Sequence, residues 1–197
     1  MFKKSKLPLL SKYYLYSLDR IYVLNILLIP LSIIYYFINF VKRVLFSNNK
    51  INTIPVIVIG NLTVGGTGKT SLVIWLCNHL TSRKYRIGVI SGGYKTNNPY
   101  DLQIVGDGAK VEDVGDEAIL IKKSSKAIVC KCKDRKKAYE YLVKQFDLDI
   151  VISDDGLSHY TLKRDLNLVI VKENRPFGNG LLLPAGPLRE PPSSIKR

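Results

Sequence analysis

A glycine-rich stretch at residues 63–70 carries the side chains of a phosphate-binding loop. It follows a Val/Ile run at 55–60 and precedes an apolar helical pattern from Gly68 to about Thr81. Glycines allow backbone conformations closed to other residues, so successive N–H groups can point at phosphate oxygens. A lysine can then reach the β- and γ-phosphates, and the hydroxyl after it can ligate Mg²⁺. The predicted nucleotide-binding residues are Thr63, Gly65, Gly66, Thr67, Gly68, Lys69 and Thr70.

This loop departs from the strict G-x-x-x-x-G-K-[ST] pattern, which requires glycine where Thr63 stands. A flexible glycine-rich linker is the alternative interpretation. A linker, however, would not lie between an apolar strand and an apolar helix. The context therefore favours a P-loop.

A second motif, at residues 148–155, is an apolar strand that ends in Asp154 and Asp155. This is the form of a metal-holding Walker B strand, although Asp-Asp-Gly is also a common turn. The carboxyl ends of strands in an open parallel sheet line the ligand crevice, so both carboxylates are expected near the P-loop. We expect Asp154 to ligate Mg²⁺ together with Thr70, and Asp155 to act with Lys69 on the phosphates.

Two further sites have a structural and a functional interpretation. Asp116 and Glu117 open a predicted helix, where acids complement the helix dipole. Either of them could instead orient or deprotonate an accepting hydroxyl, and the spacing does not choose between them. His159, four residues after Asp155, is either close to the metal site or a surface histidine.

Short apolar runs alternate with helical patterns after Pro55, which predicts a parallel α/β sheet flanked by helices, like that of P-loop NTPases. The expected strands are Val56–Ile59, Ile87–Ile90, Ala127–Cys130, Ile150–Ser153 and Leu166–Val171, with a short one at Leu102–Val105. The expected helices are Lys69–Thr81, Gly115–Lys123 and Asp134–Gln145.

The N-terminal part, residues 1–50, is both basic and apolar and is expected to be separate from a domain at 51–197. It holds eight basic residues against Asp19, about half of the chain's net charge of +14. Ile21–Val41 lacks any charge and is long enough for a membrane helix. A hydrophobic helix that anchors the chain to anionic lipid is therefore expected; a helix packed on the protein's own core is the alternative. Nucleic acid is a less favoured partner, because no nucleic-acid module accompanies the charge.

The last stretch, residues 175–192, is rich in Gly and Pro and is predicted to be irregular. Its Arg175, Asn179 and Arg189 are candidates for substrate binding, and a plain linker is the alternative. No terminal helix is expected after it, which indicates a truncated protein. The three cysteines, Cys77, Cys130 and Cys132, lack the spacing of a zinc or redox site, so inert thiols in a reducing cytosol are expected.

Four motifs together resemble the tetraacyldisaccharide 4'-kinases, the lipid A 4'-kinases of Gram-negative bacteria. They are GNLTVGGTGKT at 60–70, VGDE at 114–117, SDDGLSHY at 153–160 and FGNGLLLPAGPLREP at 177–191. The family's own loop begins Asn-x-Thr-x-Gly-Gly, which accounts for Thr63.

The resemblance implies an ATP- and Mg²⁺-dependent enzyme on the cytoplasmic face of the bacterial inner membrane. It would phosphorylate the 4'-hydroxyl of an acylated glucosamine disaccharide 1-phosphate to give lipid IVA, with Asp116 as the base. A membrane-bound nucleotide switch or targeting ATPase, and a non-catalytic fragment that only binds nucleotide, are the alternatives.

The chain also departs from the family pattern. Gly92 replaces the arginine of a Ser-Arg-Gly-Tyr-Gly motif, Lys95 its last glycine, and Ser158 a glutamine next to His159. The C-terminal part of the family, with a histidine thought to pair with the catalytic aspartate, is missing.

Overall fold

The computed structural model describes residues 23–46, 52–93 and 96–196. The chain forms two compact units: unit 1 comprises residues 1–41, 62–65 and 171–197, and unit 2 comprises residues 42–61 and 66–170. The basic N-terminal residues 1–22 and the motif residues Tyr94 and Lys95 lie outside the described part.

Unit 2 is built on a six-stranded sheet of order β3-β4-β2-β5-β1-β6. All neighbouring strands pair in parallel except β3, which runs antiparallel to β4 at one edge. Ile59 pairs with Asp154, so the carboxyl ends of β1 and β5 lie at the same level. The strands are β1 (Val56–Gly60), β2 (Ile87–Ser91), β3 (Gln103–Ile104), β4 (Ile128–Lys131), β5 (Ile150–Asp154) and β6 (Leu166–Val169).

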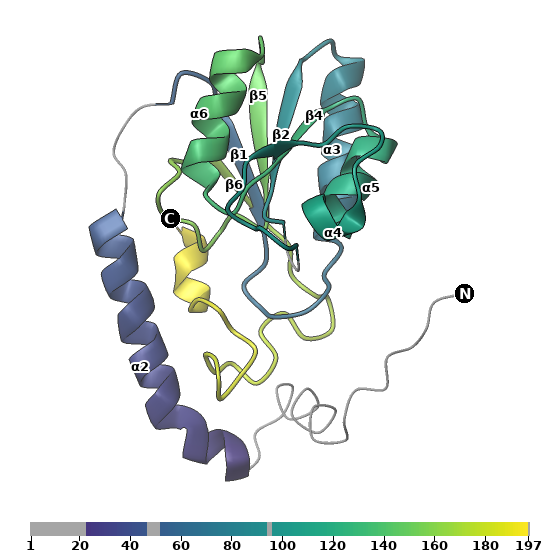
Figure 1. Ribbon diagram of the computed structural model, residues 1–197. Coiled ribbons are helices and arrows are strands. Elements are labelled where there is room, and N and C mark those ends of the chain that lie inside the picture. The colour runs from purple at the N-terminus through teal and green to yellow at the C-terminus, as the bar shows by residue number, and fades with distance from the viewer. Residues whose placement is uncertain (1–22, 47–51, 94–95, 197) are drawn as a thin grey trace. The chain divides into compact units, whose positions relative to one another are not determined.

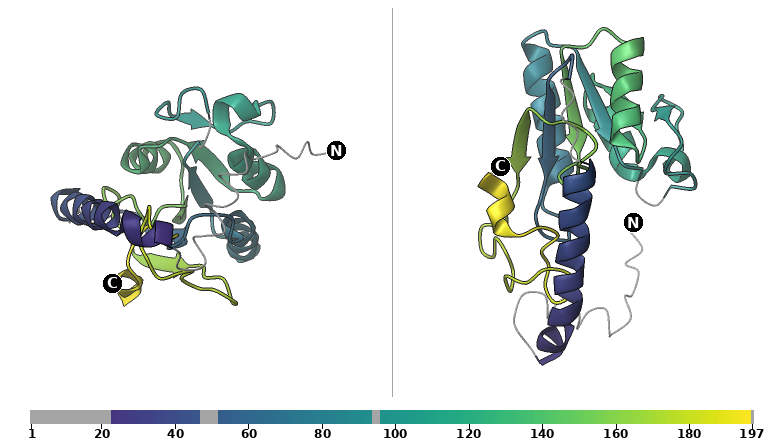
Figure 2. Two further views of the ribbon diagram at one scale, coloured as in Figure 1. Left: turned by 90° about the horizontal axis from the view of Figure 1, so that it is seen from below. Right: turned by 90° about the vertical axis from the view of Figure 1, so that its left-hand side faces the viewer.

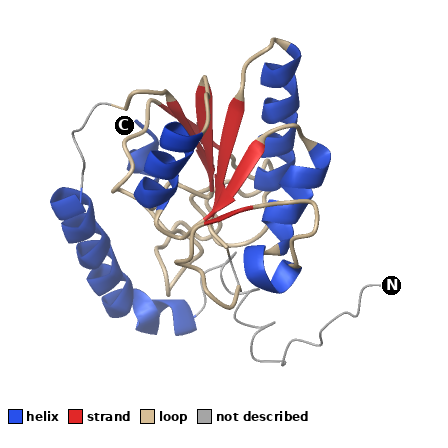
Figure 3. Ribbon diagram, turned by 45° about the horizontal axis from the view of Figure 1, so that its top comes forward, coloured by secondary structure: helices blue, strands red, loops and turns tan. Residues whose placement is uncertain are grey.

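Helices cover both faces of this sheet (Figures 1 and 3). The β-branched strand residues alternate between the two faces, which lets the central strands be buried on both sides. Val73 and Cys77 of α3 and Ala118 and Ile121 of α5 form one buried cluster with strand residues such as Val89. Helix α6 lies on the opposite face, where Leu142 and Leu148 leave no room for a side chain at Gly88. The helices are α3 (Lys69–Ser82), α4 (Val111–Val114), α5 (Asp116–Ser124) and α6 (Arg135–Gln145).

The α/β fold predicted from the sequence is confirmed, with its mostly parallel sheet, its flanking helices and its apolar N-terminal helix. In the left view of Figure 2, seen from below, the central strands of unit 2 are foreshortened, and α3 and α6 lie on opposite sides of them. The antiparallel direction of β3 and the short helix α4 were not predicted. A helix of four residues bounded by Gly115 carries too little periodicity to be recognised.

Unit 1 contains most of helix α2 (Val23–Phe46) and the C-terminal segment. The segment is irregular as predicted, but it closes with the 3₁₀ helix η1 (Pro192–Lys196), which was not expected. Helix α2 continues past the apolar run through Lys42 and Arg43, and Pro30 lies within it. By length and composition it is the one helix in the described residues that could cross a membrane, and 11% of its most apolar window is buried.

Candidate phosphate and metal site

The glycine-rich loop leads directly into α3 through Gly68, whose φ of +80° is a left-handed conformation. A side chain would be strained there, and space within 4 Å of the position a Cβ would occupy is open at both Gly66 and Gly68. The first N–H groups of α3 also lack helical partners, and the helix dipole is positive at this end. Open backbone with free donors at a helix N-terminus is suited to bind an anion such as phosphate.

Lys69 lies between an amide and a carboxylate at the start of α3. Its Nζ donates a hydrogen bond to Oδ1 of Asn61 at 2.9 Å and lies 3.5 Å from Oδ1 of Asp155. The Lys69 side chain is only 12% exposed. Asn61 directly follows β1 and Asp155 directly follows β5, so adjacent parallel strands hold the ammonium group in place.

Asp154 and Asp155 occupy different environments although they are neighbours. Asp154 is 2% exposed, and no hydrogen-bond partner reaches its Oδ1. Asp155 adopts a left-handed conformation with φ of +49°, which Asp tolerates better than most residues. This turn directs the Asp155 carboxylate toward Lys69 and leaves the Asp154 carboxylate buried.

Burial raises the pKa of Asp154 to about 6. That value includes the effects of nearby charges: the carboxylates of Glu117 and Asp155 also raise the pKa of Asp154, whereas Arg135 and Lys69 lower it. Burial and the Asp116 carboxylate likewise raise the pKa of Glu117, which keeps access to solvent. An excess of negative charge around a buried carboxylate is the condition under which a cation binds well.

The residues present fit a magnesium ion held partly by a nucleotide. The described residues include no cluster of three or more His, Cys, Asp or Glu side chains that could hold a metal alone. Mg²⁺ usually takes one or two carboxylates and completes its shell with water and phosphate oxygens. Two of the buried side-chain oxygens without a hydrogen-bond partner, Asp154 Oδ1 and Thr67 Oγ1, belong to unit 2. Thr70, the other expected ligand, lies half-buried in the first turn of α3.

Arg135 is a charged residue of this site that sequence reasoning missed. It is 3% exposed at the start of α6, and its Nη2 donates to the backbone carbonyl of Asp154 at 2.7 Å. Burial lowers the pKa of Arg135, and Asp154 and Asp155 oppose that effect. The guanidinium also lies against Gly92, just after β2. Gly92, which stands where the family motif has an arginine, therefore leaves space for the guanidinium of Arg135.

We expect Gly92→Ala to destabilise the protein because a Cβ there would lie 2.8 Å from Nη2 of Arg135. A buried guanidinium with two backbone hydrogen bonds cannot shift freely, so overpacking should cost about 1 to 3 kcal/mol. Urea unfolding would measure this loss. The matched control is Gly106→Ala, at which a Cβ meets open space. Equal stability of the two variants would contradict the close packing of Arg135.

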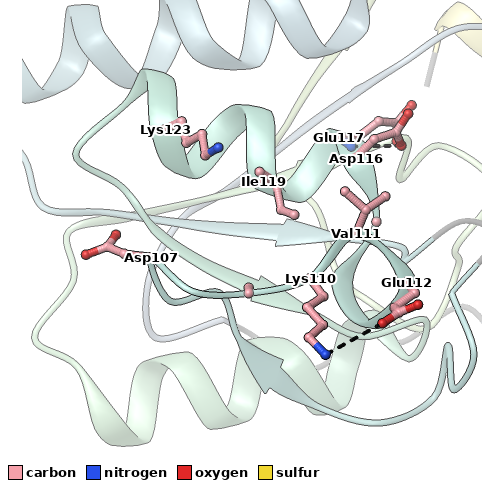
Figure 4. A pocket seen from close by; sticks show the side chains of 10 residues that line it. Asp107, Lys110, Val111, Glu112, Asp116, Glu117, Ile119 and Lys123 are labelled. Atoms are coloured by element: carbon pink, nitrogen blue, oxygen red, sulfur yellow. Dashed lines mark hydrogen bonds and ion pairs between the residues drawn. The ribbon is translucent and has the colours of Figure 1, made fainter.

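Asp116 and Glu117 lie at the start of α5, beside a groove of about 900 Å³ (Figure 4). Asp116 Oδ1 accepts a hydrogen bond from the N–H of Glu117 at 3.0 Å. Asp116 is the first residue of the helix and Gly115 occupies the N-cap without a side-chain hydrogen bond, so Asp116 does not cap the helix, although its charge complements the helix dipole. The Asp116 carboxylate is nevertheless exposed and can accept a second hydrogen bond. Lys110, Glu112 and Lys123 line the same groove.

His159 lies in the turn after β5, and burial lowers its pKa to about 4. That value includes the positive charge of Arg135, which also lowers the pKa of His159, and the Asp155 carboxylate, which opposes this effect. A neutral imidazole at pH 7 can donate one hydrogen bond and accept another, which suits a role in positioning.

We expect the imidazole proton signals of His159 to titrate with a midpoint near pH 4, against about 6.5 for a solvated histidine. The chain has only two histidines, so proton NMR would resolve them, and His159→Gln would assign the signal. A midpoint at 6 or above would show that the ring is solvated.

The other predicted residues belong to unit 1. Thr63 is buried and forms an isolated β-bridge with Leu188, and Gly65 has φ of +107° with open space around it. Arg175 is exposed, and Arg189 is half-buried. Asn179 receives a hydrogen bond from the N–H of Leu181 and donates one to the Ala185 carbonyl, so its side chain shapes the segment.

The three cysteines are not candidates for this site. All three are free and buried, and burial raises the pKa of both Cys77 and Cys130 to about 12. Such thiols stay protonated and inert, as the sequence predicted.

A comparison with protein families matches residues 24–197 to the tetraacyldisaccharide-1-P 4'-kinase family. The chain belongs to this family. It is 44% identical over 175 residues to a tetraacyldisaccharide 4'-kinase of Pasteurella multocida, covering 86% of this chain and 54% of that protein. The corresponding enzyme of Histophilus somni is 42% identical over 177 residues, 86% of this chain and 52% of its own length.

A solved structure of LpxK from Aquifex aeolicus in complex with ATP has a similar fold, with a TM-score of 0.76 and 34% identity. The match covers 89% of this chain and 57% of that one. The chain thus spans about half the length of the curated relatives it matches. The switch or targeting ATPase considered from the sequence is not favoured by these matches.

Proposed function

We propose that this chain carries the nucleotide-binding site of a kinase that transfers the γ-phosphate of ATP to a lipid. The acceptor would be the 4'-hydroxyl of tetraacyldisaccharide 1-phosphate, and the product lipid IVA of lipid A biosynthesis. The observation that carries the proposal is the position of Lys69, held between Asn61 and Asp155 after a glycine-rich loop. The choice of lipid acceptor rests on membership of the family, and the choice of ATP rests on the ATP complex of a related structure.

Each residue of the site has a separate part in this reaction. Lys69 and the N–H groups at the start of α3 neutralise the phosphates and hold them in line. Bound Mg²⁺ would offset charge on the β- and γ-phosphates, held by Asp154 and Thr70. Asp155 holds the Lys69 ammonium group beside Asn61, at the carboxyl ends of β1 and β5. Arg135, which donates a hydrogen bond to the Asp154 carbonyl, offsets the repulsion between the carboxylates of Asp154, Asp155 and Glu117.

Asp116 is the proposed base for the accepting hydroxyl. It is exposed, it lines the groove, and its neighbour Glu117 already keeps a raised pKa. A carboxylate at this position can accept the proton as the oxygen attacks phosphorus. His159, Arg175, Asn179 and Arg189 are the proposed contacts to the acceptor.

We place the enzyme at the cytoplasmic face of the bacterial inner membrane, where ATP and the acylated acceptor meet. Helix α2 exposes large apolar side chains along most of its length, and Lys42 and Arg43 follow the apolar run. Basic residues beside an apolar helix favour anionic lipid, at about 1 kcal/mol each. Nucleic acid is not among the proposed partners.

The decisive experiment is transfer of labelled γ-phosphate from Mg-ATP to tetraacyldisaccharide 1-phosphate in detergent micelles, with Asp116→Ala as the matched variant. We expect a phosphorylated lipid whose formation is lost in the variant while ATP binding is kept. Absence of product despite ATP binding would identify a fragment that needs the rest of its family's length. Product formed equally by the variant would remove Asp116 from the role of base.

A further inference from the structure

Lys131, the last residue of β4, is 1% exposed and is the largest fully buried side chain in the described part of the chain. In the sheet it pairs with Ser91, the last residue of β2, on one side and with Gln103, the first residue of β3, on the other. Residues 92–102 connect these two strands and are called the β2–β3 loop below; residues 94 and 95 of it lie outside the described part. The loop therefore leaves the sheet and returns to it on either side of Lys131.

The Lys131 side chain holds the β2–β3 loop from within. Its Nζ donates hydrogen bonds to the backbone carbonyls of Asn98 at 2.6 Å and of Asp101 at 3.2 Å. Its stem lies against Gly93, where an added Cβ would be 2.9 Å from Lys131 Cε. A buried nitrogen is costly unless it is hydrogen-bonded. Because its partners here are backbone groups, this nitrogen acts on the path of the loop.

The two residues after Lys131 hold the same part of the loop. The backbone N–H of Lys133 donates to the carbonyl of Pro99 at 2.8 Å, and Cys132 Sγ lies 3.3 Å from the carbonyl of Tyr100. The four successive carbonyls of residues 98–101 thus all contact residues 131–133. Loops are usually the more mobile parts of a fold. Four anchored carbonyls in a row indicate a loop that is kept in one path.

The β2–β3 loop is connected in turn to the helix that carries the proposed base. The N–H of Asn97 donates to the carbonyl of Glu112 in α4 at 3.0 Å. Helix α4 ends at Val114, and only Gly115 separates it from Asp116, the first residue of α5 (Figure 4). A displacement of the loop would therefore reach Asp116 over a short connection.

The start of α5 is also within electrostatic reach of the phosphate site. Burial and the Asp116 carboxylate are the main causes that raise the pKa of Glu117, and the charges of Lys69 and Asp155 act on it as well. The position of this helix end relative to Lys69 is thus a property on which transfer would depend.

We propose that Lys131 is a positioning residue for phosphate transfer, which fixes the β2–β3 loop and, through Asn97 and Glu112, the position of Asp116. The inference rests on the proposed function, which gives Asp116 its role as the base. Lys131 is buried and acts through the loop. The start of the loop is held separately, because Gly92 lies against Arg135, which donates to the Asp154 carbonyl. Loss of the Lys131 nitrogen should therefore release residues 96–101 and leave the nucleotide site in place.

Lys131→Met is the variant that tests this role. Methionine keeps an unbranched apolar stem against Gly93 but lacks the amino group, so the carbonyls of Asn98 and Asp101 lose their donor. Lys131→Arg is the conservative variant, because it keeps a donor at the end of a long stem. Lys126→Met is the matched control, because Lys126 lies exposed two residues before β4.

Hydrogen exchange of the full chain, followed by mass spectrometry of its peptides, reports on the loop and on α4 without any turnover. We expect Lys131→Met to speed exchange about tenfold or more in peptides that cover residues 96–101 and 111–117, as local anchoring is lost. Peptides from β1 and β5 should exchange as in the unsubstituted chain, and Lys126→Met should change neither region. Faster exchange at 96–101 with unchanged exchange at 111–117 would overturn the proposal, as would equally faster exchange throughout unit 2.

Phosphate transfer to the lipid acceptor tests the positioning itself. A general base contributes about 100- to 10,000-fold to a rate, so its displacement in Lys131→Met should lower kcat about tenfold or more. The KM for Mg-ATP should stay unchanged, and Lys131→Arg should restore most of kcat. An unchanged kcat, or a kcat lost together with ATP binding, would overturn the proposal. If the unsubstituted chain forms no product, the proposed function fails, and hydrogen exchange still decides whether Lys131 holds the start of α5.

Discussion

We expect Lys69→Ala to weaken Mg-ATP binding by about 100-fold or more, and to abolish any phosphate transfer. Lys69 directly follows Gly68, and its ammonium group is held 2.9 Å from Asn61 and 3.5 Å from Asp155. Its loss leaves the Asp155 carboxylate without that cation beside a site meant for phosphates. Removal of one preorganised donor from an oxyanion hole lowers kcat on the order of 100- to 1000-fold, and we expect a loss of similar size when a charged donor to phosphate is removed.

The measurement is isothermal titration of the full chain with ATP at fixed Mg²⁺, which needs no turnover. Lys144→Ala is the matched control, because Lys144 lies exposed in the last turn of α6. It should bind ATP as the unsubstituted chain does. Undiminished binding by Lys69→Ala would remove the assignment of residues 63–70 as a P-loop.

The strands were predictable because their sequence signal is local. Val/Ile runs such as Val56–Ile59 and Ile150–Ser153 predict buried strands without knowledge of their neighbours. The structure extends several by one residue at the carboxyl end, to Gly60, Ser91 and Asp154. Those residues are glycine or polar, so they carry no apolar signal although the backbone ladder continues through them.

Arg135 was not predictable, because its role depends on residues far apart in the sequence. In the chain it is one cation in a basic helix start, Lys133 to Lys137, where a solvated side chain is the usual outcome. Its burial requires a glycine after β2 and the carbonyl of Asp154 at the end of β5. Only the pairing of β2 with β5 brings these together.

Asn25 and Ser32 show the same limit in unit 1. In the sequence they interrupt an apolar run and weaken the prediction of a membrane helix. In the structure they are its buried residues, because each forms a hydrogen bond with backbone at least 150 residues away. A polar residue within an apolar helix thus marks where the helix meets protein, and its partner cannot be read from the helix itself.

Asp154→Asn should have opposite effects on stability and on metal binding. The rise of the Asp154 pKa from 3.8 to about 6 means that the folded chain holds this proton more tightly than the unfolded chain does. The free energy of unfolding therefore falls as pH rises from about 4 to about 6, by on the order of 3 kcal/mol. The asparagine side chain does not ionise, so the variant is spared this fall in the free energy of unfolding, although it buries an amide. We therefore expect it to be about 1 to 2 kcal/mol more stable than the unsubstituted chain at pH 7 and no more stable at pH 4.

The same substitution should raise the Mg²⁺ concentration needed for ATP binding, since it removes a negative oxygen that has no protein partner. Urea unfolding at pH 4 and pH 7, and ATP titrations over a range of Mg²⁺, would measure the two effects. Asp149→Asn is the control of opposite sign, because Arg86 lowers the pKa of that half-buried carboxylate to about 2 and loss of its charge should not stabilise the chain. A less stable Asp154→Asn with unchanged Mg²⁺ dependence would show that Asp154 serves the fold. A more stable variant that needs more Mg²⁺ would show that this buried carboxylate costs stability and is kept for the cation.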